Sequence, residues 1–152
     1  MELSAKLRWS NEEKFNAEIG KGRKIELNSS DKMGSAFTPM ELFLVSLAGC
    51  TAMDVQWIMS RERQKVEKFE ISIKGKRRDE DPRYFETIDL AYTIGGPNIT
   101  KNAVERAIRL SQERYCSVHA MLKENVRLNV TYTIANGKDA QQTYTYATPA
   151  TE

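Results

Sequence analysis

The sequence is poor in the residue types that build metal centres and disulfide frameworks. Its 152 residues include only two cysteines and one histidine. A structural zinc site takes four such ligands, usually in closely spaced pairs, and this chain has too few of them and no paired spacing. We therefore expect no metal and no other cofactor. In a reducing compartment, a pair such as Cys50 and Cys116 is typical of redox or catalytic use rather than of a permanent disulfide.

An excess of charge of either sign is also missing. The 23 Lys and Arg residues stand against 21 Asp and Glu residues, which gives a formal net charge of +2. Both signs are spread along the chain, so no basic face is predicted, and neither nucleic acid nor a membrane is an expected partner. The residues Met1–Lys6 show no basic segment followed by an apolar one. No secretory signal is therefore predicted, and the expected location is the cytoplasm.

One long apolar stretch, residues 38–61, predicts a central helix. Thr38 can cap this helix, Pro39 suits its first position, and Glu41 stands three residues after Thr38, as in a capping box. The first half is apolar on every side, and such a helix is normally enclosed by other elements. A bilayer span needs about 20 apolar residues. It is not expected here because polar residues interrupt the run: Glu41, Ser46, Asp54 and Gln56.

Alternation of apolar and polar residues predicts strands on both sides of this helix. Three short antiparallel strands are expected before it, in residues 3–9, 15–19 and 25–27. After it, strands are expected in residues 66–73, with an irregular register near Glu67, and in residues 88–94 and 126–134. Helical periodicity starts at Thr100, and Cys116 either ends that helix or begins a short second one.

This order of elements is typical of an α+β fold rather than of repeated βαβ units. One domain is expected over residues 1–135. The remaining residues, 136–152, form a polar tail that either pairs back across an Asn-Gly turn or is disordered.

Two cysteine-containing segments resemble the two motifs of the OsmC/Ohr family of thiol peroxidases. The first runs from Pro39–Leu42 to Ala48–Val55 and the second is Ser111–Val118. Element order and spacing match over about residues 1–134, and the residues of the two motifs are most similar to those of the YhfA-like branch. The resemblance implies antiparallel sheets wrapped around the long helix in an intertwined homodimer, with active sites at the subunit interface.

The resemblance also implies a reaction. In the family, the cysteine of the central helix attacks an organic or inorganic hydroperoxide as a thiolate and becomes a sulfenic acid. A second cysteine resolves it as a disulfide, which a dithiol reductant reopens. Cys50 would be the peroxidatic residue and Cys116 the resolving one, in a hydroperoxide reductase that serves the oxidative stress response.

Family members activate the first cysteine with an arginine that a glutamate holds. In the peroxidase branches that glutamate directly follows the motif proline, but here Met40 follows it and the carboxylate comes at Glu41. One residue rotates a helical side chain by about 100°. Glu41 is therefore either the catalytic carboxylate that holds the arginine or only the capping partner of Thr38. Arg8 and Arg23 are the candidate arginines, and both are equally compatible with a surface position.

The physical chemistry of the two thiols differs. A free thiol has a pKa of about 8.5, and burial of Cys50 within an apolar helix would raise it unless a cation is supplied. Cys116 lies beside the expected start of a short helix, where free backbone donors stabilise a thiolate, so it is easier to ionise. His119 is expected to be a surface or packing histidine rather than a base. Met53, Trp57 and Met59 are expected to pack in the core, or to line an apolar substrate pocket at the interface.

Two further functions stay open. One is a dimer without turnover that binds a small apolar ligand in the same interface pocket, and the shifted position of Glu41 favours it. The other is a redox sensor whose cysteines form a disulfide without catalytic consumption of peroxide.

Overall fold

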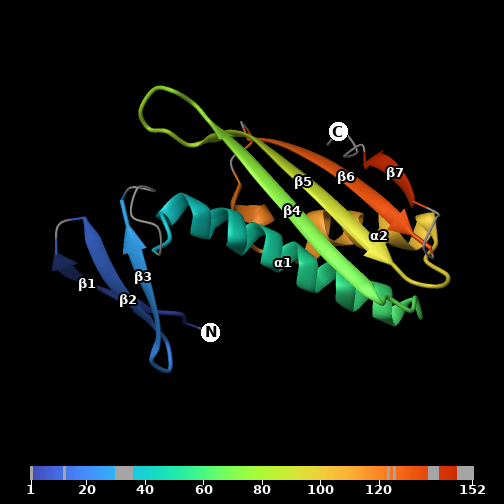
Figure 1. The fold of residues 1–152 in the computed structure, drawn as a ribbon, viewed down its shortest axis with the longest axis horizontal. Coiled ribbons are helices and arrows are strands. Elements are labelled where there is room, and N and C mark those ends of the chain that lie inside the picture. Colours follow the sequence, from blue (N-terminus) through green and yellow to red (C-terminus); the bar gives the residue numbers. More distant parts are fainter. Residues whose placement is uncertain are drawn as a thin grey trace. The chain divides into compact units, whose positions relative to one another are not determined.

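The protein is described from a computed structural model, which describes residues 2–11, 13–29, 36–122, 124, 126–136 and 141–146. The chain forms two compact units, Met1–Phe43 and Leu44–Glu152. Each unit has a β-sheet of its own (Figure 1). Helix α1, Pro39–Arg61, begins in the first unit and continues into the second.

The first unit contains a three-stranded antiparallel sheet in the order β1–β2–β3. Its strands are β1 (Ala5–Asn11), β2 (Lys14–Ile19) and β3 (Arg23–Asn28). The β2–β3 hairpin turns through Lys21 and Gly22, which have positive φ angles of 58° and 77°. Glycine adopts such angles without steric cost. The three strands predicted before the helix are thereby confirmed.

Helix α1 begins where the capping signal predicts. The backbone N–H of Thr38 donates to Glu41 Oε2 at 2.7 Å, and the N–H of Glu41 donates to Thr38 Oγ1 at 3.2 Å. These two bonds are the reciprocal pair of a capping box. With 23 residues, α1 does reach the length and apolar content of a membrane span, contrary to the expectation from its polar interruptions. Core helices of soluble proteins pass the same test, so this carries little weight.

The second unit contains a four-stranded sheet in the order β4–β5–β6–β7. Its strands are β4 (Lys68–Arg77), β5 (Phe85–Gly95), β6 (Arg127–Ala135) and β7 (Gln141–Tyr146). Strands β5 and β6 pair in parallel, and the other two neighbouring pairs are antiparallel. A parallel pair needs a crossover connection, which helix α2 (Lys101–Leu110) supplies. The sheet is therefore mixed, whereas purely antiparallel sheets were expected.

Two details of this sheet bear on the sequence predictions. The register irregularity between β4 and β5 lies at Lys76 and Arg77 rather than near Glu67, which precedes the strand. Part of the tail does pair back, because β7 lies antiparallel to β6. Residues 137–140 and 147–152 of that tail lie outside the described residues.

The core of the second unit lies between the sheet and the two helices, which cover the same face of it (Figure 1). Strand β5 buries alternate side chains, from Ile88 to Ile94, and α2 buries a stripe that starts at Ala103. Helix α1 contributes one face. The buried residues of that face are Leu47, Thr51, Val55, Ile58 and Met59.

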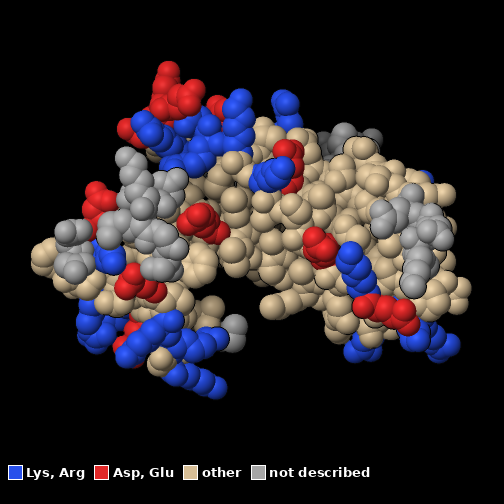
Figure 2. Space-filling model, viewed as in Figure 1, with Lys and Arg blue, Asp and Glu red and all other residues tan. Residues whose placement is uncertain are grey.

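The other side of α1 is apolar as well but is not covered. The side chains of Val45, Met53 and Trp57 are 58%, 74% and 48% exposed. The sequence predicted that other elements would enclose this helix, and within the described part of the second unit only one of its faces is buried. On the face shown in Figure 2, Lys and Arg side chains lie beside Asp and Glu side chains.

Candidate active site

The structure brings the two cysteines of the second unit together. Cys50 lies in the middle of α1 and is half-buried, while Cys116 follows the end of α2 and is only 2% exposed. Both are free thiols. The two sulfur atoms and a carboxylate oxygen of Asp54 all lie within 4.8 Å of one another. The site is thus a cluster of two thiols and one carboxylate.

Local structure positions each of these groups. Cys50 and Asp54 are four residues apart on α1, so they share one face of the helix. Helix α2 ends in a π-helical turn, η2 (Ser111–Tyr115), after which Cys116 is extended with ψ at 98°. The N–H of Cys116 donates to the carbonyl of Ser111 at 2.8 Å. Single π-helical turns are common at functional sites, and this one directly precedes Cys116.

A chain of buried hydroxyl groups ends at Asp54. Ser111 Oγ donates to Asp54 Oδ2 at 3.0 Å. The same Oγ lies 3.0 Å from Thr51 Oγ1, which lies 2.6 Å from the Tyr92 hydroxyl. Each hydroxyl has one proton, and an ionised carboxylate can only accept. Because Ser111 donates to Asp54, Thr51 must donate to Ser111 and Tyr92 to Thr51.

The direction of this chain agrees with the state of Tyr92. Burial raises the pKa of its phenol, and this effect exceeds the opposing effect of the hydrogen bond to Thr51. The phenol therefore keeps its proton at neutral pH and can donate it. The carboxylate of Asp54 is held in one orientation by a sequence of three side chains from α1, β5 and η2.

Cys116 is not easily ionised. Burial raises the pKa of its thiol to about 12, with further increases from the hydrogen bond to Cys50 and from the charges of Cys50 and Asp54. The N–H of His119 donates to Cys116 Sγ at 3.3 Å and lowers the pKa, but it does not offset the other effects. The expected short helix is a single turn of 3₁₀-helix, η3 (His119–Met121). The expectation that backbone donors at a helix start would make Cys116 easy to ionise is therefore wrong.

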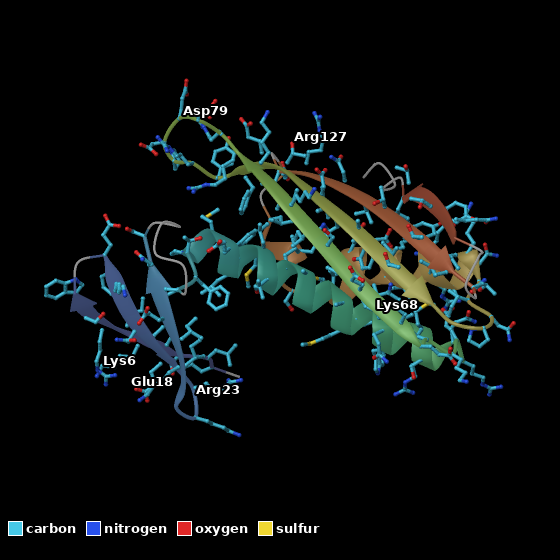
Figure 3. All side chains as sticks on the ribbon, in the orientation of Figure 1. Lys6, Glu18, Arg23, Lys68, Asp79 and Arg127 are labelled. Carbon is cyan, nitrogen blue, oxygen red and sulfur yellow. The ribbon has the colours of Figure 1, made fainter. Side chains whose placement is uncertain are left out.

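Within the part of the chain that the structure describes, no Lys or Arg forms a salt bridge with Asp54. Of the two candidate arginines, Arg8 pairs with Glu18 at 3.1 Å in the first unit. Arg23 begins β3 of the same unit (Figure 3). Activation of Cys50 by either arginine stays a prediction.

Glu41 uses one of its two carboxylate oxygens for the helix cap. Its Oε2 accepts from the backbone N–H of Thr38 at 2.7 Å and from the Thr38 hydroxyl at 2.9 Å. These hydrogen bonds, first the backbone one, lower the pKa of Glu41. Among the described residues, no hydrogen bond or salt bridge to Oε1 is formed. The capping prediction is confirmed, and the role of Glu41 in holding an arginine stays a prediction.

The remaining side chains near the cysteines divide between core and surface. His119 Nδ1 lies 2.8 Å from the carbonyl oxygen of Gln112, to which it donates, as expected of a packing histidine. Met59 is fully buried, whereas Met53 and Trp57 are exposed. The Trp57 ring contacts the edge of Tyr115, with 5.9 Å between ring centroids.

Sequence reasoning missed the carboxylate and the hydroxyls of this site. Asp54 carried a usable signal, because it is a charged residue in an apolar helix four positions after a cysteine. Ser111 lies within the second cysteine motif, but its helical periodicity indicated only a residue that packs on the buried side of a helix. Tyr92 is 41 residues from Thr51 in sequence, and nothing local to β5 indicates their contact.

Comparison with known proteins agrees with the fold and the motifs. The family model of the OsmC-like proteins matches residues 31–131. The protein YhfA of Escherichia coli strain K12 is 37% identical over 134 residues, which cover 87% of this chain and 98% of YhfA. A solved structure of a hypothetical protein from Aquifex aeolicus VF5 is 34% identical, with a TM-score of 0.79 over 88% of this chain and 96% of that one.

A more distant structure has a name that bears on chemistry. It is an organic hydroperoxide resistance protein, OsmC, from Legionella pneumophila. Its TM-score is 0.67 at 16% identity, over 89% of this chain and 97% of that one, so the likeness is one of fold. With the family model covering two thirds of the sequence and both cysteine motifs in place, the chain belongs to the family of OsmC-like proteins.

Proposed function

We propose that the protein is a thiol-dependent peroxidase that reduces hydroperoxides through Cys50 and Cys116. The observation that carries this proposal is the approach of two free sulfur atoms to within 4.8 Å, from elements 66 residues apart in sequence. A disulfide needs a sulfur–sulfur distance of about 2.05 Å, so a small local movement closes it. The name of the Legionella pneumophila structure, with its hydroperoxide resistance, agrees with this substrate class.

The burial of the two thiols divides their roles. Cys50 is half-buried and can be reached by a peroxide, while Cys116 is 2% exposed. The Cys50 thiolate attacks the outer peroxide oxygen, the O–O bond breaks, and the alkoxide takes a proton to leave as an alcohol. Cys116 then attacks the sulfenic acid of Cys50, a disulfide forms and water leaves. A dithiol returns both cysteines to the thiol state.

A homodimer is part of this proposal. The uncovered side of α1 exposes Val45, Met53 and Trp57, and a large apolar surface of this kind marks an interface. A second copy of the chain would cover it and would bring further side chains to Cys50. Glu41, whose Oε1 is not used by the cap, would hold the activating arginine, with Arg8 and Arg23 as the candidates.

Mass spectrometry of the parent and two variants tests the reaction. The parent, treated with graded cumene hydroperoxide, should lose two hydrogens and regain them with dithiothreitol. Cys116→Ser should gain oxygens at Cys50, because its sulfenic acid has no partner and oxidises further to sulfinic and sulfonic acid. Cys50→Ser should consume no peroxide, since a serine hydroxyl is not nucleophilic enough at neutral pH. If the parent keeps both thiols and the peroxide is not consumed, the peroxidase proposal fails.

One observation favours a second candidate function. Glu41 is engaged by Thr38, and among the described residues no Lys or Arg forms a salt bridge with Asp54, so that carboxylate holds no cation beside the Cys50 thiol. A dimer that binds a small apolar ligand at the same interface, without turnover, has no need of that cation. A redox sensor would instead form the Cys50–Cys116 disulfide in a single reaction with the oxidant. It would not go on to consume peroxide catalytically when a dithiol is present. Steady-state peroxide consumption separates these functions from the enzyme.

A further inference from the structure

The step that closes the disulfide has to remove a proton from a thiol that holds it tightly. Cys116 is buried, and the pKa of its thiol is raised to about 12, so hardly any thiolate exists at neutral pH. Only the thiolate is a good nucleophile. The single backbone N–H from His119 does not change this balance. A group close to Cys116 must therefore accept the proton while the sulfur attacks.

We propose that Asp54 is a catalytic residue that carries this proton from the Cys116 thiol to the oxygen that leaves Cys50. The inference rests on the proposed function in one respect, namely that Cys50 is oxidised first and Cys116 resolves it. It concerns the resolving step alone and assigns no part in the attack on the peroxide to Asp54.

The geometry places the carboxylate close to both the donor and the acceptor of the proton. An oxygen of Asp54 lies within 4.8 Å of both sulfur atoms, which lie within the same distance of each other. Ser111 holds Oδ2, and among the described residues no hydrogen bond to Oδ1 is formed. The chain Tyr92–Thr51–Ser111 fixes the orientation of the carboxylate. A general base acts from hydrogen-bond distance, about 2.6–3.2 Å, or through one water molecule, and a separation of up to 4.8 Å fits the second case.

The atoms and charges of the step balance. The Asp54 carboxylate takes the proton of the Cys116 thiol, and the Cys116 sulfur attacks the Cys50 sulfur as its S–O bond breaks. The departing hydroxide takes the proton from Asp54 and leaves as water. The products are the disulfide, one water molecule and the original carboxylate, so Asp54 is regenerated. No oxidant or reductant beyond the sulfenic acid is needed.

Electrostatics favours proton transfer over free ionisation. Among the described residues, Cys50, Cys116 and Tyr92 are titratable groups that face Asp54, and no Lys or Arg forms a salt bridge with it. A Cys116 thiolate beside an ionised Asp54 would be a second negative charge in a buried place, which is costly. When Asp54 takes the proton, the cluster keeps a single negative charge throughout. If Asp54 acted only through its charge, it would suppress the thiolate, and its removal would speed up disulfide closure.

The test uses an aromatic disulfide, so that it does not depend on peroxide chemistry. Dithiodipyridine reacts with Cys50 and releases one thiopyridone, and Cys116 then attacks the mixed disulfide and releases a second. Both releases are followed by absorbance in stopped flow. The variant Asp54→Asn retains an oxygen that can accept from Ser111 but cannot take a proton. Asp79→Asn, in the exposed β4–β5 turn (Figure 3), is the matched control.

In Asp54→Asn the second release should slow by about 100-fold, the usual scale of general base catalysis, and the first should not slow. The rate of the second release in Asp54→Asn should rise about tenfold per pH unit between pH 7 and 9, because this release then follows the small thiolate fraction of Cys116. The parent rate should change little over that range. Asp54→Glu should retain more of the second rate than Asp54→Asn, and Asp79→Asn should match the parent.

Two results would overturn the inference. One is a second release in Asp54→Asn that is as fast as in the parent or faster. The other needs no variant to fold: a parent whose second release itself rises tenfold per pH unit uses free thiolate and no base. Failure of the peroxidase proposal looks different. The parent would then consume no cumene hydroperoxide, while the second release from dithiodipyridine would still depend on Asp54.

Discussion

Removal of the Ser111 hydroxyl should destabilise the fold more than its size suggests. Ser111 is fully buried and serves two partners, since it donates to the Asp54 carboxylate and accepts from Thr51. A hydrogen bond to a charged group contributes about 1.5–3 kcal/mol, and a neutral one about 1 kcal/mol. Ser111→Ala should therefore lower the free energy of unfolding by about 2–4 kcal/mol. The side chain itself is small, so little of this loss comes from a cavity.

Two comparison variants make this value interpretable. Tyr92→Phe removes only the first hydroxyl of the chain, after which Thr51 still donates to Ser111, so about 1 kcal/mol should be lost. Ser60→Ala changes an exposed serine of α1 and should stay within about 0.5 kcal/mol of the parent. Urea denaturation measures all three, at one fixed protein concentration because the stability of the proposed dimer would depend on concentration. If the free energy of unfolding of Ser111→Ala lies within about 0.5 kcal/mol of the parent value, the buried hydroxyl groups do not orient Asp54.

Three further outcomes are expected. Sedimentation at micromolar concentration should show a dimer, and Trp57→Glu, on the exposed apolar side of α1, should shift it toward monomer; a compact parent monomer contradicts the shared site. Glu41→Gln keeps an oxygen for Thr38 but loses the charge that would hold the activating arginine, so alkylation of Cys50 should shift to higher pH. Identical alkylation curves would mean that Glu41 only caps the helix. Because the folded pKa of Cys116 is raised to about 12 and the unfolded value is about 8.5, the folded state binds more protons between them. Parent stability should therefore fall by up to about 1.4 kcal/mol per pH unit above pH 8.5 relative to Cys116→Ala, and parallel curves in urea titrations would refute this.

Local signals predicted the elements of this fold well. The Thr38–Glu41 capping box fixed the start of α1, and period-two alternation found β5 and β6 with their buried faces. These patterns depend on residues close in sequence, so a sequence is enough to read them. The parallel pairing of β5 with β6 was not predicted, since it depends on how the α2 crossover returns to the sheet. Pairing between distant strands leaves no mark in the alternation of either strand.

The site shows the same division between local and distant information. The two cysteines were predicted as a pair through the family resemblance, and the structure brings them together. The ease of ionisation of Cys116 was misjudged because the sequence showed a possible helix start but not the depth of burial. Asp54 was treated as a polar interruption of an apolar helix. Its partners Ser111 and Tyr92 come from other elements, so its role appears only when those elements are in place.

In the proposed reaction, the high pKa of Cys116 creates the need for a nearby base, and the position of Asp54 meets that need. In that reaction, a resolving cysteine that stayed ionised would itself react with peroxide, in competition with Cys50. Burial prevents this by holding Cys116 as a neutral thiol. The same burial would block the attack on Cys50 unless a base acts at the moment of reaction. A carboxylate held by Ser111, within 4.8 Å of both sulfur atoms, meets that need without an additional charge in the resting site.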